Sequence, residues 1–304
     1  MTPTFPLQGN VGFVGIGAMG LAMALRLRDG GQAVVVHDID AAREALAATA
    51  GCLLAASPAA LAAQCALVIV AVVDGMQSHE VLFGAAGLAA GLRPGATVML
   101  CPTIAPADVE HAAVTLQALG ITTLDAPMSG GPQRARDGSM SLMVACDDAV
   151  YQRWQPLLAR LSSRLFRVGS RPGDGARTKL VNNLLAAINL AGAAEALALA
   201  QHLGLDPALA LDVIEQSSGQ SRIGSDRLRR ALAAGDAVPP PPQARMALLA
   251  KDSALALAAA HQVSLTLPVG TAAAGQFAGA LAAGLGDADD SALWRWLAAG
   301  AGKG

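Results

Sequence analysis

The chain has 304 residues, with 21 basic and 23 acidic side chains and a formal net charge of −2. This length is sufficient for two domains that each bury a sizeable core. Hydrophobic residues make up 53% of the chain but aromatic residues only 3%, so the cores must consist mainly of closely packed Ala, Leu and Val. The charge pattern contains no long run of one sign, which argues against binding to nucleic acid or to an anionic membrane surface.

Cysteine usage and the opening segment indicate a cytoplasmic protein. None of the cysteines has a CxxC partner or a histidine at metal-ligand spacing, so we expect free, buried thiols and no metal site. The four are Cys52, Cys65, Cys101 and Cys146. The segment MTPTFPLQGN has no basic region followed by an apolar one, so it predicts no secretory signal.

The apolar composition raises the question of a membrane span, which needs about 20 apolar residues in a row. The longest apolar stretch, residues 184–200, contains Asn189 and Glu195. The run over residues 65–73 is too short. We interpret both as buried elements of a soluble protein.

Short β-branched runs alternate with Ala- and Leu-rich segments in the first half of the chain. Expected strands lie at residues 11–14, 33–37, 67–73, 98–101 and 123–126, with two later ones at 142–146 and 165–168. Expected helices lie at residues 19–29, 41–49, 58–63 and 106–119. Continuous apolar strands are typical of a parallel sheet covered on both faces, and their alternation with helices predicts a doubly wound α/β domain of the Rossmann type.

The pattern changes near residue 170, where the turn-rich segment 170–175 precedes an almost wholly helical sequence. A long helix is expected from about residue 176 to residue 202, followed by one that opens at Asp206-Pro207 and by helices at 245–261 and 269–283. The run Pro239–Pro242 predicts a stiff loop. We therefore expect a dinucleotide-binding domain over residues 1–170 and an all-helical domain over residues 171–304.

The sequence Gly15-Ile-Gly17-Ala-Met-Gly20 follows the first expected strand and opens a helix. In a GxGxxG turn the first glycine permits a tight bend, the second lets the backbone approach a pyrophosphate, and the third lets helix and strand pack closely. The pyrophosphate then lies on free N–H groups at the helix N-terminus. In a chain with 33 glycines the motif alone is weak evidence, but its strand–turn–helix context indicates dinucleotide binding.

Asp38 ends the second expected strand, where an acidic side chain can accept hydrogen bonds from both ribose hydroxyls of NAD. A carboxylate here would repel the 2′-phosphate of NADP, which favours NAD. Arg43 offers the alternative, because its guanidinium could bind that phosphate, although an exposed helix residue is its simpler interpretation.

Two further segments point to a substrate site. Asp125-Ala-Pro-Met-Ser129-Gly130-Gly131 follows a strand, and its hydroxyl and glycine N–H groups could bind a carboxylate, although such a string is often only a turn. In Gly175-Ala-Arg-Thr-Lys179-Leu-Val-Asn182-Asn183, Lys179 and Asn183 share one helix face. A lysine there commonly extends to water, but two asparagines in an apolar helix indicate a polar pocket.

Lys251-Asp252 lies within an otherwise apolar helix. Its simplest interpretation is a local surface ion pair, which stabilises a protein little. With the three preceding motifs in order, however, the chain resembles the β-hydroxyacid dehydrogenase family from Val11 to about Ala298. That resemblance implies a Rossmann domain, a long interdomain helix, an all-helical second domain and a cleft between the domains.

The resemblance also implies a role for each matching residue. Ser129, Gly130 and Gly131 would hold the substrate carboxylate, Lys179 would be the catalytic acid/base, and Asn183 would orient the substrate and the lysine. Asp252 would support the motif that contains it. The cofactor contacts would be Gly15, Gly17, Ala18, Met19, Gly20, Asp38, Val72, Val73, Thr103 and Lys251.

The implied reaction is hydride transfer between NAD and a small C3–C4 hydroxy acid. Three tracts are similar to threonate-type dehydrogenases, whereas Pro102 departs from the family pattern. The segment before Lys251, with its four-proline run and Arg245, also departs from it, and because this change falls on a cleft wall it leaves the substrate open. The tracts are VLFGAAGLAAGLRPG, Gly138-Ser-Met-Ser and Asp289-Asp290-Ser291-Ala292. The Ala-rich C-terminal helices could also bury a subunit interface, so we expect a homo-oligomer, either a dimer or a tetramer.

Two other interpretations differ in class. An imine reductase on the same fold would usually have an acidic or tyrosyl residue in place of Lys179. A non-catalytic dinucleotide-binding protein would be expected to have lost this lysine. The presence of Lys179 with Asn183 favours the dehydrogenase.

Overall fold

The computed structural model describes residues 9–234 and 242–300. Most of the opening segment and Pro239–Pro241 lie outside the described residues. The chain divides into an N-terminal unit, Met1–Lys179, and a C-terminal unit, Leu180–Gly304. Helix α8 (Asp174–His202) is continuous across the division, and each unit is described below by itself.

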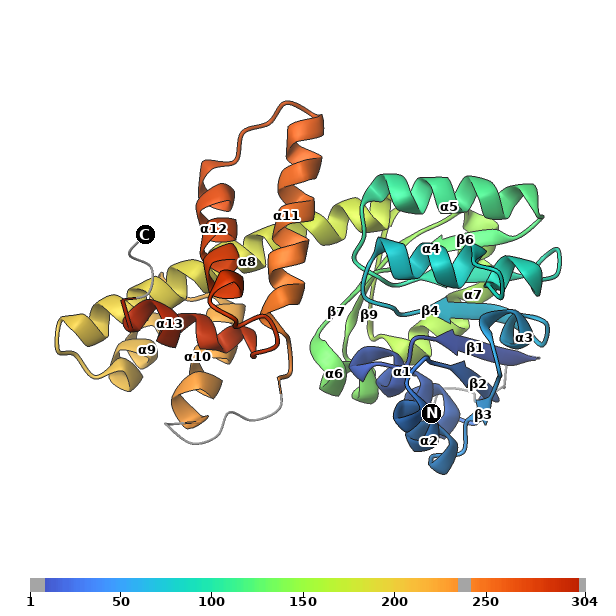
Figure 1. Ribbon diagram of the computed structural model, residues 1–304, viewed down its shortest axis with the longest axis horizontal. Helices are drawn as coiled ribbons and strands as arrows, with labels where there is room; N and C mark the ends of the chain where they lie inside the picture. Colours follow the sequence, from blue (N-terminus) through green and yellow to red (C-terminus); the bar gives the residue numbers. More distant parts are fainter. Residues whose placement is uncertain (1–8, 235–241, 301–304) are drawn as a thin grey trace. The chain divides into compact units, whose positions relative to one another are not determined.

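A nine-stranded sheet forms the centre of the N-terminal unit (Figure 1). Its strands are β1 (Asn10–Val14), β2 (Val34–His37), β3 (Leu53–Leu54), β4 (Cys65–Val70), β5 (Thr97–Leu100), β6 (Thr122–Asp125), β7 (Met128–Ser129), β8 (Ser141–Ala145) and β9 (Arg164–Gly169). The order β3-β2-β1-β4-β5-β6 is parallel throughout, and β8 pairs antiparallel with β6 and parallel with β9. The strand order reverses between β1 and β4, which is where doubly wound sheets bind ligands.

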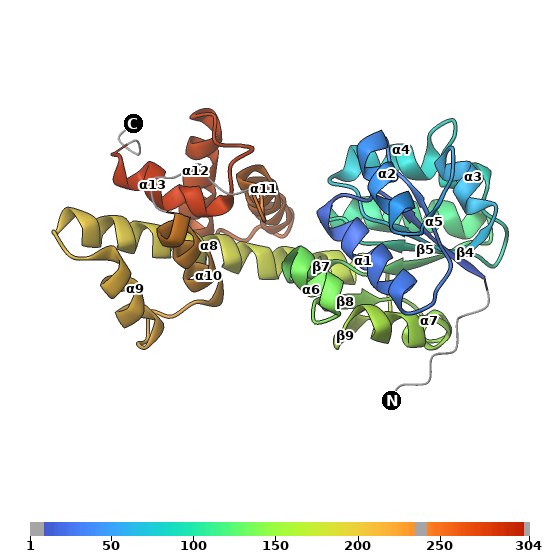
Figure 2. The same ribbon diagram turned by 90° about the horizontal axis from the view of Figure 1, so that it is seen from below.

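Successive side chains of the central strands enter two separate cores, because neighbouring residues of a strand point to opposite faces. Phe13 and Ile69 belong to one core, and Val14 and Val70 to the other. Helices α1, α2 and α7 contribute to the first core and α3, α4 and α5 to the second; Figure 2 shows α7 and α4 on opposite sides of the sheet. The helices are α1 (Ala18–Asp29), α2 (Ala41–Thr49), α3 (Pro58–Ala62), α4 (Gly75–Phe83), α5 (Pro106–Ala118), α6 (Gly131–Asp137) and α7 (Asp148–Leu161), with a 3-10 turn at Leu88–Ala90.

The doubly wound sheet confirms the predicted fold class, and β8 and β9 extend the sheet as expected. The expected strand 67–73 ends earlier, at Val70. Helices α4, α6 and α7 were not expected. Their sequences resemble loops, since α6 begins with Gly-Pro and α7 contains Pro156.

The C-terminal unit is all-helical, as predicted, and its core surrounds Phe277 and Trp294 with many alanines. Its elements after α8 are α9 (Pro207–Glu215), α10 (Arg222–Ala234), α11 (Met246–Gln262), α12 (Pro268–Ala282), a 3-10 turn (Asp290–Ala292) and α13 (Leu293–Ala298). Helices α11 and α12 lie side by side (Figure 1). The α10 helix was not expected; it is polar on one face and lacks the continuous apolar run of its neighbours.

The tract Asp289-Asp290 connects three segments of this unit. Asp289 accepts hydrogen bonds from Arg230 Nη1 and from the backbone N–H of Gln243, each at 2.8 Å. Asp290, which is 2% exposed, pairs with Arg227 at 2.8 Å. Burial raises the pKa of Asp290 to about 6 despite that arginine. Through these hydrogen bonds and ion pairs, the tract connects the 3-10 turn Asp290–Ala292 to α10 and to the residues before α11.

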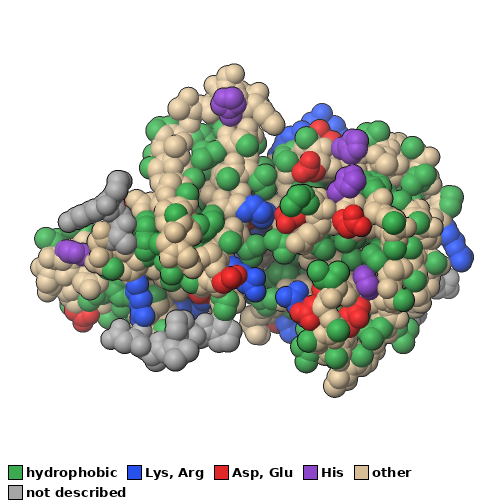
Figure 3. Space-filling model, viewed as in Figure 1, with side chains coloured by type: hydrophobic (Ala, Val, Ile, Leu, Met, Phe, Trp, Pro, Cys, Tyr) green, Lys and Arg blue, Asp and Glu red, His purple; other side chains and the backbone are tan. Residues whose placement is uncertain are grey.

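Helix α8 has the length and apolarity of a membrane span by composition alone, and 44% of its most apolar window is buried within the protein. Charged side chains of both signs are interspersed on the face shown in Figure 3.

All four cysteines are free and buried, as expected. Burial raises the pKa of Cys65 to about 12 and that of Cys146 to about 11, so both thiols stay protonated and unreactive at neutral pH.

Asp125, at the end of β6, binds the beginning of α8. Its Oδ2 accepts hydrogen bonds from the backbone N–H groups of Gly173 at 2.8 Å and Ala176 at 3.1 Å. A Cβ at Gly175 would lie 2.8 Å from the same carboxyl group, so this approach requires glycine. These bonds explain why α8 starts at Asp174, slightly earlier than expected, since they satisfy N–H groups that a helix N-terminus leaves without partners.

The pKa of Asp125 predicts a pH-dependent stability. Burial raises this pKa from 3.8 to about 6 against the opposing effect of the backbone hydrogen bonds. The folded protein therefore binds this proton more tightly than the unfolded chain, and the resulting stability is complete below pH 4 and lost as the pH rises through 6. Between pH 4.5 and pH 7 the wild type should lose on the order of 2 kcal/mol more unfolding free energy than Asp125→Asn, measured in urea.

The matched control is Asp108→Asn, which neutralises an exposed aspartate of the same unit. Its pH profile should parallel that of the wild type. A parallel profile for Asp125→Asn as well would contradict the prediction.

Candidate active site

The glycine turn lies at the carboxyl end of β1, at the point where the strand order reverses. Gly15 has a φ of +84°, and a Cβ there would lie 2.9 Å from both the carbonyl of Ala71 and Cγ1 of Val72. A Cβ at Gly20 would lie 2.1 Å from the carbonyl oxygen of Gly15. Gly17 caps α1 without a side-chain hydrogen bond, which leaves the first N–H groups of the helix for a ligand. The turn thus fits a dinucleotide pyrophosphate.

The other predicted cofactor residues of this unit lie around the same edge of the sheet. Ala18 and Met19 are the first residues of α1. Val72 and Val73 follow the end of β4, and Val72 is in close reach of Gly15. Thr103 follows the end of β5, the neighbour of β4. Since parallel strands end at one edge, the fold brings these residues to the reversal point.

Asp38 is buried directly after β2, and both oxygens of its carboxylate already have protein partners. Oδ2 accepts from the backbone N–H of Ile16 at 2.7 Å, and Oδ1 accepts from that of Asp40 at 2.9 Å. Arg43 Nη1 lies 3.9 Å from Asp38 Oδ2, and Arg43 Nε lies 3.3 Å from Asp40 Oδ2. Asp38 therefore holds the glycine turn against β2, a role that its place in the sequence did not indicate.

The predicted carboxylate-binding turn follows β6. Ser129 lies in β7 and is half-buried, and it pairs with Ser141 of β8. Gly130 and Gly131 have φ values of +138° and +76°, in the region that favours glycine. This backbone turns abruptly into α6, and the Arg134 side chain of α6 lies close to Gly130, 3.2–3.3 Å from where a Cβ would stand.

Lys179 is only 8% exposed, so it does not extend freely into water as a lysine near a helix N-terminus commonly does. It lies on α8 in the part of the helix that belongs to the N-terminal unit. Burial of an amine that can carry charge is costly. The residue is therefore set apart from ordinary surface lysines.

Asn183 lies one helical turn after Lys179 and is held from two sides. Its Nδ2 donates to Asp252 Oδ2 of α11 at 2.5 Å, and its Oδ1 accepts from Asn182 Nδ2 at 2.9 Å. Lys251 Nζ binds the other oxygen of Asp252 at 2.8 Å. Asp252 is 7% exposed, so Lys251-Asp252 is more than the surface pair that its sequence alone suggests.

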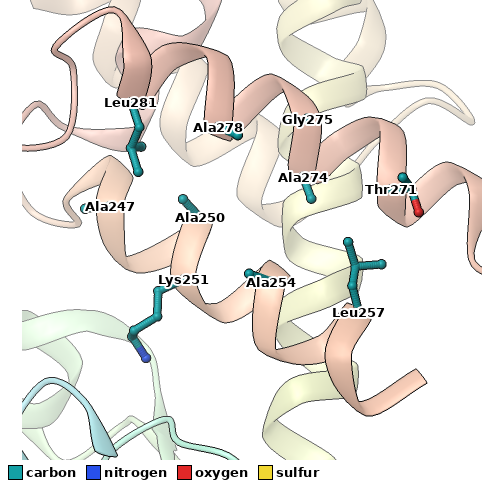
Figure 4. Close-up of a pocket in the computed structure, with 10 residues that line it drawn as sticks. All are labelled: Ala247, Ala250, Lys251, Ala254, Leu257, Thr271, Ala274, Gly275, Ala278 and Leu281. Atoms are coloured by element: carbon teal, nitrogen blue, oxygen red, sulfur yellow. The ribbon is translucent and has the colours of Figure 1, made fainter. Parts of the chain in front are cut away.

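A groove of about 530 Å³ lies between α11 and α12 (Figure 4). Its lining consists of small and apolar residues apart from Lys251 and Thr271, and Lys251 extends from α11 away from α12. The ten lining residues are Ala247, Ala250, Lys251, Ala254, Leu257, Thr271, Ala274, Gly275, Ala278 and Leu281. Within residues 9–234 and 242–300, no cluster of His, Cys, Asp and Glu could hold a metal ion.

Sequence reasoning missed two groups that position this site. Asp125 lies in the motif after β6, but its hydrogen bonds to the start of α8 were not predicted. The sequence feature that could have indicated them is an aspartate at the end of a buried strand together with glycines before a later helix. Glu44 was not singled out. Its carboxylate accepts the backbone N–H of Asp38 at 3.0 Å, and its place in the first turn of α2 was the only hint.

Comparison with known proteins covers both units. Residues 10–169 match the model of the NAD binding domain of 6-phosphogluconate dehydrogenase, and residues 173–297 match that of the NAD-binding region of NADP-dependent 3-hydroxyisobutyrate dehydrogenase. L-threonate dehydrogenase from Cupriavidus necator is 37% identical over 289 residues, which cover 94% of this chain and 95% of that protein.

Solved structures agree with these matches. The crystal structure of 3-hydroxyisobutyrate dehydrogenase from Salmonella typhimurium has a TM-score of 0.87 and 31% identity, and the match covers 95% of this chain and 99% of that one. An imine reductase from Myxococcus stipitatus has a TM-score of 0.65 at 20% identity over 96% of this chain and 100% of its own, and shares the fold. The chain therefore belongs to the β-hydroxyacid dehydrogenase family of NAD(P)-dependent oxidoreductases.

Proposed function

We propose that this protein transfers a hydride between NAD and a small C3–C4 hydroxy acid that is threonate-like or 3-hydroxyisobutyrate-like, with Lys179 as the proton-handling residue. The observation that supports this most is the burial of Lys179 one helical turn before Asn183, whose amide is fixed by Asp252. Burial of a lysine amine is unusual, because lysines near a helix N-terminus commonly extend to water. The threonate dehydrogenase relative supports the substrate class.

In the oxidation direction, Lys179 accepts the hydroxyl proton while the carbon–oxygen double bond forms. NAD held at the glycine turn would supply the hydride acceptor for this oxidation. In reduction, the Lys179 ammonium opposes the negative charge that develops on the alkoxide oxygen and then donates its proton to it. Asn183 orients the substrate and Lys179. Its hydrogen bonds to Asn182 and Asp252 fix the direction of the amide, so that its second N–H and second lone pair have a defined position.

The substrate carboxylate binds at Ser129, Gly130 and Gly131. The Ser129 hydroxyl and the glycine N–H groups are donors, and donors of this kind form strong hydrogen bonds to an anion. The positive φ values of the two glycines support this assignment, because only a residue without a Cβ adopts such a turn readily.

The cofactor is NAD, bound by residues 1–170, with Lys251 of the helical domain over residues 171–304 as a further contact. Asp38 supports NAD over NADP, since a 2′-phosphate beside this carboxylate would be repelled. We further propose a cytoplasmic homo-oligomer, a dimer or a tetramer.

Lys179→Met tests the chemical role directly. Without a group to move the proton, kcat should fall by about 10²–10⁴, whereas the dissociation constant for NADH, measured by fluorescence titration, should stay within about twofold of the wild type. The control Arg177→Met removes an exposed cation from the same helical turn and should keep most of the activity. A Lys179→Met enzyme with near wild-type kcat would contradict the proposed role of Lys179.

Asp38→Asn tests cofactor preference more cleanly than an alanine, because the amide oxygen can still accept the N–H of Ile16. Loss of the negative charge should raise kcat/KM with NADP relative to that with NAD by about tenfold. The two values are measured side by side with one hydroxy acid. An unchanged ratio would mean that Asp38 does not face the ribose.

Asp252→Asn tests whether Asp252 acts through Asn183. Loss of the charged acceptor should lower kcat/KM for the hydroxy acid by about tenfold, since hydrogen bonds to charged groups contribute roughly 1.5–3 kcal/mol. In the double variant with Asn183→Ala, the loss should be no greater than with Asn183→Ala alone. Additive losses would show that Asp252 acts independently.

A further inference from the structure

We infer that Glu44 is a positioning residue for the cofactor site, which holds Asp38 in place and adds the negative charge that selects NAD. The inference rests on the proposed role of Asp38 as the ribose acceptor. The first turn of α2, which contains Glu44, would thereby position Asp38, which the glycine turn and β2 alone do not do.

Glu44 connects α2 to the end of β2 through one oxygen. Its Oε1 accepts the backbone N–H of Asp38 at 3.0 Å and lies 3.3 Å from Nδ1 of His37. The Glu44 side chain is 22% exposed, so these contacts are only partly screened by water. The Asp38 backbone is thereby fixed on one side while its side chain holds the N–H of Ile16 on the other.

His37 lies beside Glu44 and is itself held by the chain after β3. Nδ1 of His37 lies 3.0 Å from the carbonyl oxygen of Ala55, which follows β3. The carbonyl and the Glu44 carboxylate only accept hydrogen bonds, so Nδ1 must be the nitrogen that carries a proton. The single Nδ1 proton is thus donated to the Ala55 carbonyl, which fixes the imidazole 3.3 Å from the Glu44 carboxylate, while the backbone N–H of Asp38 is the donor that holds Glu44 itself.

The charges around this point favour hydroxyls over a phosphate. Asp38, Asp40 and Glu44 bring three carboxylates together, and the Arg43 guanidinium lies 3.3 Å from Asp40 Oδ2 and 3.9 Å from Asp38 Oδ2. Arg43 is therefore engaged with carboxylates in this arrangement. Ribose hydroxyls can donate to the remaining lone pairs of Asp38, whereas a 2′-phosphate would add negative charge where carboxylates already exceed the cation.

Two substitutions separate the geometric effect of Glu44 from its electrostatic effect. Glu44→Gln keeps an acceptor oxygen and nearly the same volume but removes the charge, and Glu44→Ala removes both. In fluorescence titrations of the purified protein, Glu44→Ala should weaken NADH binding by about tenfold, and Glu44→Gln should largely restore it. Glu44→Gln should also narrow the preference for NADH over NADPH by about threefold or more.

The matched control is Glu80→Gln, which removes one carboxylate from an exposed position on α4 and should change neither dissociation constant. Wild-type NADH binding in Glu44→Ala, or an unchanged NADH-to-NADPH ratio in Glu44→Gln, would overturn the inference. If Glu44→Ala does not fold, the ratio in Glu44→Gln decides.

These titrations need no hydroxy acid, so they remain valid if the proposed substrate is wrong. Asp38→Asn distinguishes the two levels of failure. If it leaves the NADH-to-NADPH ratio unchanged, the ribose assignment itself fails. If it shifts the ratio while both Glu44 variants bind like the wild type, only the inference about Glu44 fails.

Discussion

The hydrogen bonds from the start of α8 to Asp125 connect the parallel sheet to the helix that contains Lys179. A helix N-terminus leaves several N–H groups without partners, and a carboxylate is the strongest acceptor that a side chain can offer them. Asp125 receives two of these groups while it remains almost fully buried. The position of Lys179, only one turn further along, therefore depends on how precisely the end of β6 is placed.

The C-terminal unit fixes its polar residues by the same principle. Asp252 is buried but accepts from both Asn183 and Lys251, so its desolvation is offset by a charged partner and a neutral one. Removing either partner would leave a buried acceptor unsatisfied, which costs more than the net strength of a hydrogen bond. The arrangement thus favours one orientation of the Asn183 amide over its flipped alternative.

Much of this architecture was predictable because it follows from local pattern. The β-branched runs predicted the parallel strands to within a few residues, and the glycine spacing together with Asp38 predicted the phosphate turn. Helices α6 and α7 were missed because tertiary packing overrides the turn-like glycine and proline in them. The distant partners of Asp38, Asp125 and Asn183 could not be predicted either, since each lies in another segment and only the folded sheet or helix pair brings it near.

The aspartates at the carboxyl edge of the sheet also restrict what can bind there. Asp125 ends β6 and Asp38 directly follows β2, and each has a carboxylate oxygen that accepts backbone N–H groups of a segment distant in sequence. A carboxylate used in this way stabilises a turn but also makes its surroundings negative. Phosphate groups bind where free N–H groups outweigh that charge, and the glycine turn at the start of α1 offers such groups. With NAD bound as proposed, this structural use of aspartate would separate the place for the pyrophosphate from the place for the ribose hydroxyls.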